Sequence, residues 1–482
     1  MKLKEILEQI VGHEIDEFTY KSRIDEWNAW YAGHVKSFHE YRQYNGKKNI
    51  KRERASMQMA KRVCEDWANL LINEKTDIVI SDDNNGKSTD ELARLLYDLK
   101  FWVTANQGVE KAFALSMGAF VVRVSVSVDE DGNDFGDGDL HISFIPATKM
   151  YPLEYDEDNK ITECAFISRI RKNRYRVAVH HLNERGNYVI DNCEADGSTE
   201  DNLSIDEATW FQFDTRSPLP WFTVLYPNIA NNIDVNSPYG ISIFANSIDK
   251  LKTCDETFDS LRNEFSLGKK RIFVNAKMLA LDENTGEYRD VFDPNDVSFY
   301  TLPEGEEGDN PLLSDSTQQL RIHEHVEGIQ TALNALSDGC GFGTEHYKFD
   351  GVNVSTATQV VSENSDMFRT MKKHEIVIED CLKTLTRAIL YASATFCGKV
   401  IAPVDAEITI KFDDSIIVDK QTEKASDRYD VDLGVMSKAS YRAKWYGEDE
   451  ETAQEKIDEI QQTALESMIA ASQAANEGSD EE

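Results

Sequence analysis

Several short motifs in this sequence carry residue types that could do chemistry, and a glycine–lysine–serine run is the most enzyme-like of them. The run GKS at residues 86–88 follows a predicted strand and precedes a predicted helix, which is the setting of a phosphate-binding loop. However, Ser81 stands where that motif requires its first glycine, and Asp82 and Asp83 would repel phosphate. The pattern therefore indicates a polar surface turn rather than a nucleotide site.

Two further runs resemble metal sites. Residues 129–134 imitate the first half of a calcium loop, but Asp134 occupies the glycine position and no glutamate stands at position twelve. His323 and His325 fall short of the H-E-x-x-H zinc motif because Glu327 stands where the second histidine is needed. We interpret the first run as a solvated hairpin turn, with weak cation binding as the alternative, and the second as solvated helix surface.

A glycine-rich run, Gly339, Gly341 and Gly343, resembles a nucleotide-binding loop only weakly. A helix rather than a strand is predicted before it, so the run indicates a helix end followed by a flexible loop. No serine–histidine–aspartate or cysteine–histidine arrangement can be assembled from the sequence, and no carboxylate pair stands out. The residues therefore predict no catalytic, cofactor-binding or metal site, and a protein that is not an enzyme.

Length, composition and charge exclude several classes of protein. The chain has 482 residues, 40% of them hydrophobic, which is enough for about three domains with buried cores. Its net charge of −35 excludes a protein that grips nucleic acid over its whole surface, because such binding needs lysine and arginine on the phosphates. No window of about 18 apolar residues occurs, so no membrane span is predicted. The seven scattered cysteines, without a CxxC, predict reduced and mostly buried thiols.

Residues 1–236 predict an α+β domain. Residues 1–75 are expected to be helical, because apolar residues recur every four positions between Met59 and Leu71. From Ala119 the period changes to two, and residues 119–147 predict a hairpin across a long acidic turn. Further strands are expected at 76–80, 162–169, 174–181 and 188–191. Together these strands predict a meandering sheet.

The second half of the chain alternates long helices with a small β-rich insert. Residues 241–265 contain no glycine or proline, which predicts a helix of about 38 Å that ends at Gly268. The order helix, insert, helix predicts an antiparallel pair with a small domain at its tip. The elements expected after the first helix are a β-rich insert, a helix over 316–337, a glycine-rich loop, a helix from a capping box at Thr356 to about Phe396, a strand at 407–412 and a helical C-terminal region.

Three segments then carry a resemblance to a known family: residues 51–74, 237–265 and 351–375. In this order and spacing the chain resembles the portal proteins of long-tailed double-stranded DNA bacteriophages over nearly its whole length. The resemblance implies a portal-like α+β fold with an α+β wing, an antiparallel two-helix stem that carries a small β-rich clip, one very long helix and a helical crown. The implied parts are a wing over 1–236, stem helix one over 237–267, a clip over 268–314, stem helix two over 315–338, a tunnel loop over 339–354, a long wing helix over 355–404, and a crown with an acidic C-terminal tail over 405–482.

The resemblance also implies a function and a set of partners. Twelve copies are expected to form a ring-shaped channel at one vertex of the virion capsid, after assembly in the host cytoplasm. Double-stranded DNA would pass through this channel during packaging and ejection. The implied partners are the terminase motor, the head–tail connector proteins, and the major capsid and scaffolding proteins, with no cofactor and no membrane. A strongly acidic chain suits this role, because it would repel a sliding duplex rather than hold it.

The resemblance places the tunnel loop at the narrowest point of the channel. Its DNA-facing side chains would be His346, Tyr347, Lys348 and Phe349, and Lys348 would supply a belt of positive charge. The alternative is a helix connection that is packed away from the channel, with Tyr347 and Phe349 in a local core.

Two further groups of site residues are expected near the clip. A basic cluster of Lys269, Lys270 and Arg271 stands at the stem–clip junction, with ordinary surface charge as the alternative interpretation. The clip's docking residues would be Phe273, Phe292, Phe299 and Tyr300.

Two other functions compete with a portal. A nucleotide-dependent DNA-packaging enzyme subunit needs an intact phosphate loop or a carboxylate metal cluster, and Ser81 and Asp134 are where these fail. Another structural virion or scaffold component would not need a helix–β–helix hairpin followed by a glycine-rich loop and a very long helix.

Overall fold

The computed structural model resolves two compact units. The first unit comprises residues 1–354 and 363–413, and the second comprises residues 355–362 and 414–482. The structure describes residues 3–16, 18–44, 48–81, 86–125, 138–199, 202–268, 272–275, 280–281, 288–289, 299–302, 313–315, 319–349, 365–413, 420–447, 449 and 451–463.

The N-terminal region is mostly helical. The helices are α1 (Leu3–Val11), α2 (Lys21–Tyr31), α3 (Lys36–His39), α4 (Met59–Leu71), α5 (Lys87–Asp98) and α6 (Phe101–Leu115). On α4, the residues predicted to form an apolar face, including Val63 and Trp67, are fully buried. The prediction that residues 1–75 are helical throughout is wrong, because β1 (Glu40–Tyr44) and β2 (Asn49–Glu53) form an antiparallel ribbon within them.

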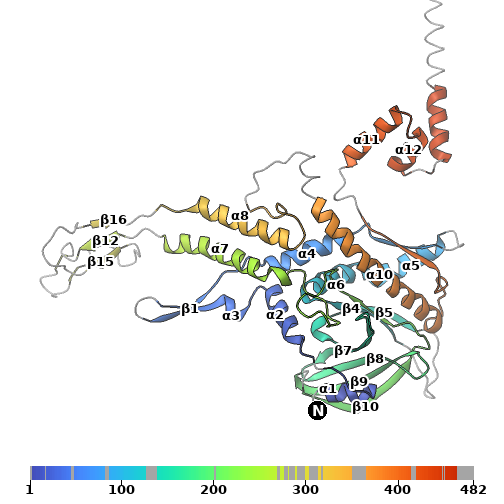
Figure 1. The fold of residues 1–482 in the computed structure, drawn as a ribbon, viewed down its shortest axis with the longest axis horizontal. Coiled ribbons are helices and arrows are strands. Elements are labelled where there is room, and N and C mark those ends of the chain that lie inside the picture. Colours follow the sequence, from blue (N-terminus) through green and yellow to red (C-terminus); the bar gives the residue numbers. More distant parts are fainter. Residues whose placement is uncertain are drawn as a thin grey trace, which may run out of the picture. The chain divides into compact units, whose positions relative to one another are not determined.

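Two sheets of the first unit confirm the predicted hairpin and meander. β4 (Gly118–Ser125) pairs with β5 (Asp139–Pro146), and β11 (Phe222–Leu225) adds to the other side of β4. The larger sheet has five antiparallel strands in the order β10-β9-β8-β7-β6, which is a simple meander. Its strands are β6 (Met150–Tyr155), β7 (Ile161–Arg171), β8 (Arg174–Leu182), β9 (Tyr188–Thr199) and β10 (Asn202–Asp214). The apolar face of α1, with Leu3, Ile6 and Leu7, packs on one face of this sheet (Figure 1).

Two helices, α7 (Ile248–Leu267) and α8 (Ile322–Gly339), lie side by side and form the predicted helix pair (Figure 1). α7 begins at Ile248 rather than at Ile241, because the backbone N–H of Ile243 donates to the carbonyl of Phe113 on α6 and pins this segment outside the helix. α8 begins at Ile322 rather than at residue 316, directly after Arg321, whose guanidinium binds Glu264 on α7 at 2.9 Å. This ion pair lowers the pKa of Glu264 to about 2.

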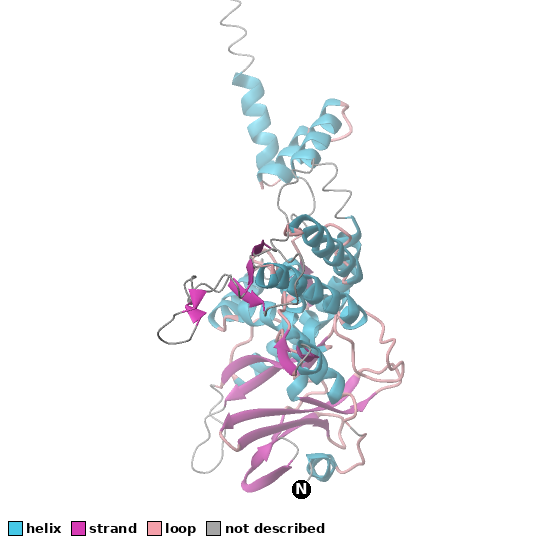
Figure 2. Cartoon of the chain, turned by 90° about the vertical axis from the view of Figure 1, so that its left-hand side faces the viewer, coloured by secondary structure: helices cyan, strands magenta, loops and turns pink. Residues whose placement is uncertain are grey.

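Short strands lie between α7 and α8, as the β-rich insert predicts. They are β12 (Ile272–Asn275), β13 (Ala280–Leu281), β14 (Tyr288–Arg289), β15 (Phe299–Leu302) and β16 (Leu313–Asp315). β12 is the centre of a three-stranded sheet, with β15 parallel on one side and β16 antiparallel on the other. Figure 2 shows the same strands from the side.

The longest helix of the described chain is α10 (Ser365–Phe396). Its predicted apolar face is buried, with Met367, Met371, Ile378, Leu382, Leu385 and Ile389 each at most 4% exposed. The capping box at Thr356 lies outside the described residues. β17 (Glu407–Lys411) forms at the predicted strand position and pairs antiparallel with β3 (Asp77–Ser81) within the first unit. All seven cysteines are free and buried, as their spacing predicts.

The second unit contains α11 (Lys420–Asp432), α12 (Lys438–Tyr446) and a further helical segment at 451–463. Asp427 on α11 joins the first two helices, because it accepts a hydrogen bond from the Trp445 indole at 2.8 Å and binds Lys444 at 2.7 Å. Ser437 caps α12 by accepting the backbone N–H of Ser440, and Gly447 ends the helix in a left-handed conformation.

Candidate functional site

The enzyme-like and metal-like motifs do not assemble into a site in the described residues. The tripeptide at 86–88 begins α5, with Gly86 at φ +81° and Ser88 buried, and the hydroxyl of Thr89 accepts the backbone N–H of Ile80. His323 is exposed and lies 3.4 Å from Glu327, whereas His325 faces Glu264 on α7 at 3.5 Å. These two histidines therefore point to different neighbours, as predicted. The acidic run at 129–134 lies outside the described residues.

The glycine-rich run ends α8, as predicted, and turns the chain sharply. Gly341 and Gly343 have φ values of +87° and +80°, which side chains other than glycine rarely adopt. A Cβ atom at Gly341 would also lie 2.7 Å from the side chain of Thr370 on α10. This turn directs residues 342–349 back along α8 and α4.

A stack of aromatic rings fixes the first half of this loop to the core. Phe342 is almost fully buried and stacks on Trp67 of α4 at 4.4 Å and on His346 at 4.3 Å. The Trp67 indole donates to the carbonyl of Cys340 at 3.0 Å. His374 on α10 meets the edge of Trp67, and burial lowers the pKa of His374 to about 3. The loop is therefore built on a buried aromatic platform rather than suspended freely.

His346 and Tyr347 complete this platform. The imidazole of His346 lies 3.6 Å from the carboxylate of Asp66 on α4, and the ring of Tyr347 meets His346 edge-on at 4.7 Å. Tyr347 is 8% exposed, and burial, together with the nearby Asp66 charge, raises the pKa of its hydroxyl. Within one chain, Tyr347 thus has the packing that the local-core interpretation predicts.

Lys348 and Phe349 are exposed, as is His346, whereas Tyr347 is buried. Gln330 on α8 fixes the backbone on either side of Lys348. Its amide nitrogen donates to the carbonyl of Tyr347 at 2.7 Å, and its amide oxygen accepts the N–H of Phe349 at 2.8 Å. The structure therefore places one exposed cation on a backbone segment that is held from both sides. The role of these four residues in a channel stays a prediction.

We expect Gln330→Ala to release the segment that carries Lys348. The substitution removes both hydrogen bonds, so the chain should lose about 1–3 kcal/mol of local stability. Hydrogen exchange should show faster exchange of the Phe349 amide, while amides of the five-stranded sheet keep their protection. Thr331→Ala, one residue along α8 at an exposed position, is the control. Unchanged exchange at Phe349 would contradict the role assigned to Gln330.

The remaining predicted site residues lie at the insert between α7 and α8. Lys269, Lys270, Arg271 and Phe292 lie outside the described residues. Phe273 lies on β12, where its backbone pairs with Tyr300 of β15 and with Ser314 of β16. Phe299 opens β15 and pairs with Ile272. The structure thus brings three of the four predicted docking residues into one small sheet.

A cluster that sequence reasoning missed joins the N-terminal segment to the five-stranded sheet. His13 and Glu163 lie 3.1 Å apart, and their ligand atoms and that of Glu154 lie within 4.8 Å of one another. The backbone N–H of Leu182 donates to the other oxygen of Glu163. The two carboxylates raise the pKa of His13 against the opposing effect of burial. His13 and Glu163 are 150 residues apart, so no local sequence pattern predicts this cluster.

One comparison decides which family the chain belongs to. The model of a family described as phage portal protein, SPP1 Gp6-like, matches residues 13–467, which is most of the chain. The chain belongs to this phage portal protein family. The resemblance drawn from the three segments is therefore confirmed, as is the portal-like α+β fold class. As a phage portal protein, the chain serves as a subunit of the portal ring at the capsid vertex.

Comparisons with curated proteins and with solved structures add little to this family assignment. No curated protein matches this portal protein. It is similar to a chain from the neck of a native GTA particle computed with C12 symmetry, at 9% identity and a TM-score of 0.36, covering 79% of this chain and 88% of that one. A chain from the neck of an empty GTA particle computed with C6 symmetry gives 11% identity and a TM-score of 0.37, covering 80% and 87%. Among the helices that the structure describes, none has the length and apolar character needed to cross a membrane.

Proposed function

We propose that this portal protein lines the passage through which double-stranded DNA enters the phage head and later leaves it. In this proposal the ring stands in the virion, its acidic subunits each carry a net charge of −35, and the chain performs no catalysis of its own. The family membership supports the portal role, and the position of Lys348 supports its connection to DNA.

The observation that carries the channel proposal is the exposed lysine, Lys348, in the loop after α8. Gln330 holds the backbone on both sides of Lys348, so the side chain starts from a defined position. Repeated around a ring, this lysine would form a belt of charge that touches phosphates. Each phosphate contact adds salt-dependent affinity, whereas the net charge of −35 per subunit keeps the total affinity low. Transient contact without retention is what a sliding duplex requires.

We also propose that the insert between α7 and α8 is the docking surface for the terminase motor and then for head–tail connector proteins. In the three-stranded sheet, β15 and β16 are the outer strands. Outer strands leave backbone donors and acceptors that a partner strand can pair with. Packaging needs a motor, and Ser81 breaks the phosphate-loop pattern of this chain. In this proposal the terminase supplies ATP hydrolysis, and major capsid and scaffolding proteins surround the ring during assembly in the host cytoplasm.

The test is a charge reversal at Lys348 in the full-length protein. We expect Lys348→Glu to form normal rings and normal empty heads, and to lower the yield of DNA-filled heads by about tenfold or more, since it replaces a belt of attraction with one of repulsion. Lys399→Glu, an exposed lysine after α10, is the control with the same change of charge. Electron microscopy of rings and nuclease-protected DNA per head are the measurements. Normal packaging and DNA retention in Lys348→Glu would remove this loop from the channel, and loss of rings would assign it to subunit packing.

A further inference from the structure

Two glutamates of the five-stranded sheet are paired with each other at its edge. β6 is an outer strand of the sheet, and Glu154 near its end is directly opposite Glu163 of β7 in the strand register. The register shifts on both sides of Glu154, so β6 bulges there and re-aims this side chain. Like charges in direct cross-strand positions destabilise a sheet. Among the described residues, no lysine or arginine forms an ion pair with either glutamate, so His13 is left to offset two carboxylates.

The three side chains form a donor set for a metal ion. The His–Glu cluster, defined here as His13, Glu154 and Glu163, offers one ligand atom from each residue, and these atoms all lie within 4.8 Å of one another. Nε2 of His13 and Oε2 of Glu163 are 3.1 Å apart. Two ligands of a tetrahedral zinc ion are separated by about 3.4 Å, so this pair already has nearly the required spacing. Glu154 is exposed, and rotation about its side-chain bonds would bring the third oxygen to the same ion.

Atoms outside the cluster hold His13 and Glu163 in the orientation that metal ligands need. Nδ1 of His13 lies 3.2 Å from the backbone carbonyl oxygen of Glu14, which can only accept a hydrogen bond, so Nδ1 carries a proton. In the neutral ring the lone pair of Nε2 then faces Glu163, and a cation or a second proton must lie between them. The backbone N–H of Leu182 donates to Oε1 of Glu163 at 2.9 Å and leaves Oε2 for an ion. Such outer hydrogen bonds regularly accompany metal-binding histidines and carboxylates.

The cluster is closed on the protein side and has acidic surroundings. The side chain of Glu163 is 6% exposed and that of His13 is 39% exposed, so an ion could enter from solvent. The hydroxyl of Tyr155 donates to Asp16 at 2.9 Å, which brings residues 13–16 beside the end of β6. These residues and residues 154–158 contain six acids and no lysine or arginine. Their charge raises the local concentration of cations.

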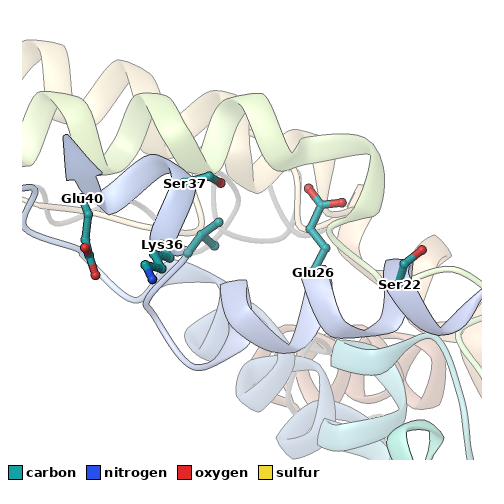
Figure 3. Close-up of a pocket in the computed structure, with 6 residues that line it drawn as sticks. Ser22, Glu26, Lys36, Ser37 and Glu40 are labelled. Atoms are coloured by element: carbon teal, nitrogen blue, oxygen red, sulfur yellow. The ribbon is translucent and has the colours of Figure 1, made fainter. Parts of the chain in front are cut away.

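A second place where acids gather lacks such a donor set. The hollow beside α2 and α3 is lined by Ser22, Glu26, Val35, Lys36, Ser37 and Glu40 (Figure 3). None of these lining residues is a histidine, and Glu40 is ion-paired with Lys51 at 2.8 Å. Lys36 would also repel an entering cation. This hollow therefore provides a comparison within the same unit.

We propose that the His–Glu cluster binds one divalent transition-metal cation, and that Zn²⁺ is the ion its ligands suit best. One imidazole nitrogen and two carboxylate oxygens match zinc, whereas Ca²⁺ and Mg²⁺ favour ligand sets made of oxygen alone. Three protein ligands leave a fourth tetrahedral position for water. The ion would fasten the segment that follows α1 to the outer strand of the sheet. This inference does not depend on the proposed channel or docking surface.

A zinc titration of the full-length protein tests the site. After treatment with a chelator and its removal, calorimetry with ZnCl₂ should give one site per chain with a Kd of about 1 μM or tighter. Glu154→Gln and His13→Ala should each weaken this binding by about tenfold or more. CaCl₂ should bind at least about tenfold more weakly than ZnCl₂. Zinc should also slow hydrogen exchange at the amide of Ile15, which lies in the segment that the ion fastens.

Two control variants make the same chemical change as Glu154→Gln outside the cluster. Glu157→Gln removes an exposed carboxylate in the turn after β6, and Glu26→Gln removes one from the hollow beside α2. Both should bind zinc as the wild type does. Circular dichroism checks the fold of each variant, and if His13→Ala does not fold, Glu154→Gln decides, because its side chain is exposed and glutamine keeps its shape.

The outcomes separate a metal site from an ordinary ion pair. One tight site that the cluster variants weaken and the control variants keep would support the proposal. If the wild type binds no zinc at about 100 μM, a second proton lies between His13 and Glu163 and the proposal is wrong. Zinc binding that Glu154→Gln leaves unchanged would place the ion elsewhere in the chain and would also overturn the proposal.

Discussion

Asp255→Ala should destabilise the first unit by about 3–5 kcal/mol, because it removes the buried acceptor that fastens α3 and the residues after β2 to α7. Asp255 is 4% exposed, and its carboxylate accepts the Met57 N–H at 2.7 Å and the hydroxyl of Ser56 at 3.2 Å. His39, 1% exposed, contacts the same carboxylate at 3.1 Å. The Val35 N–H donates to Nδ1 of His39, so the proton on Nε2 points to Asp255. Alanine would leave these donors buried and unpaired.

Urea unfolding and hydrogen exchange at the Met57 amide measure this loss. Asp255→Asn keeps an oxygen for the Met57 N–H but turns an amide N–H₂ toward His39, so its cost should fall between those of the wild type and alanine. Asp249→Ala is the matched control on the same helix, since Asp249 is 94% exposed at its side chain and should change stability by no more than about 0.5 kcal/mol. A loss below about 1 kcal/mol in Asp255→Ala would show that α3 and the residues after β2 are held to α7 by other contacts.

The region around α4 contains one element that the sequence predicts and one that it does not. The helical spacing of Val63 and Trp67 is a local pattern, and it predicts α4 correctly. The ribbon before it has few apolar residues, and its strand sequences, EYRQY and NIKRE, show no apolar period of two that would predict strands. The signal that could have found it is the Asn45-Gly46 dipeptide, which is a strong hairpin turn sequence.

Elements fixed by distant partners could not be placed from the sequence. Residues 241–247 have the composition of a helix, but the hydrogen bond from Ile243 to Phe113 holds them in another conformation. The sequence pattern predicts the strand at 407–412 within one residue, but its partner β3 lies more than 300 residues earlier, and no local signal indicates that pairing. In each case the local pattern gives the element's type, and a long-range contact decides its place.

The candidate site also combines features that the local sequence predicts with features that only long-range packing determines. The glycines predict the end of α8 and the turn after it, because positive φ is a local requirement. Nothing local predicts that Phe342 inserts between Trp67 and His346, or that Gln330 brackets Lys348. The exposed lysine could be named from the sequence, but the platform that positions it comes only from packing between α4, α8 and α10.

Phe342→Ala should cost about 3–5 kcal/mol and release the loop that carries Lys348. Phe342 is 2% exposed, and its ring fills the space between Trp67 and His346, so alanine leaves a cavity in the middle of the stack. The platform would lose two aromatic contacts at once. We expect faster hydrogen exchange across residues 342–349 and a red shift in the fluorescence of Trp67 as water reaches its ring.

Phe342→Leu separates packing from stacking. Leucine keeps most of the buried apolar volume but removes both ring contacts, each worth about 0.5–1.5 kcal/mol beyond burial, so its cost should be roughly half that of alanine. Phe349→Ala is the exposed control in the same loop and should leave stability within about 0.5 kcal/mol of the wild type. If the platform positions Lys348, Phe342→Ala should also lower DNA packaging toward the level of Lys348→Glu, while rings still form. A stable Phe342→Ala protein with unchanged exchange in the loop would show that the stack does not hold Lys348 in place.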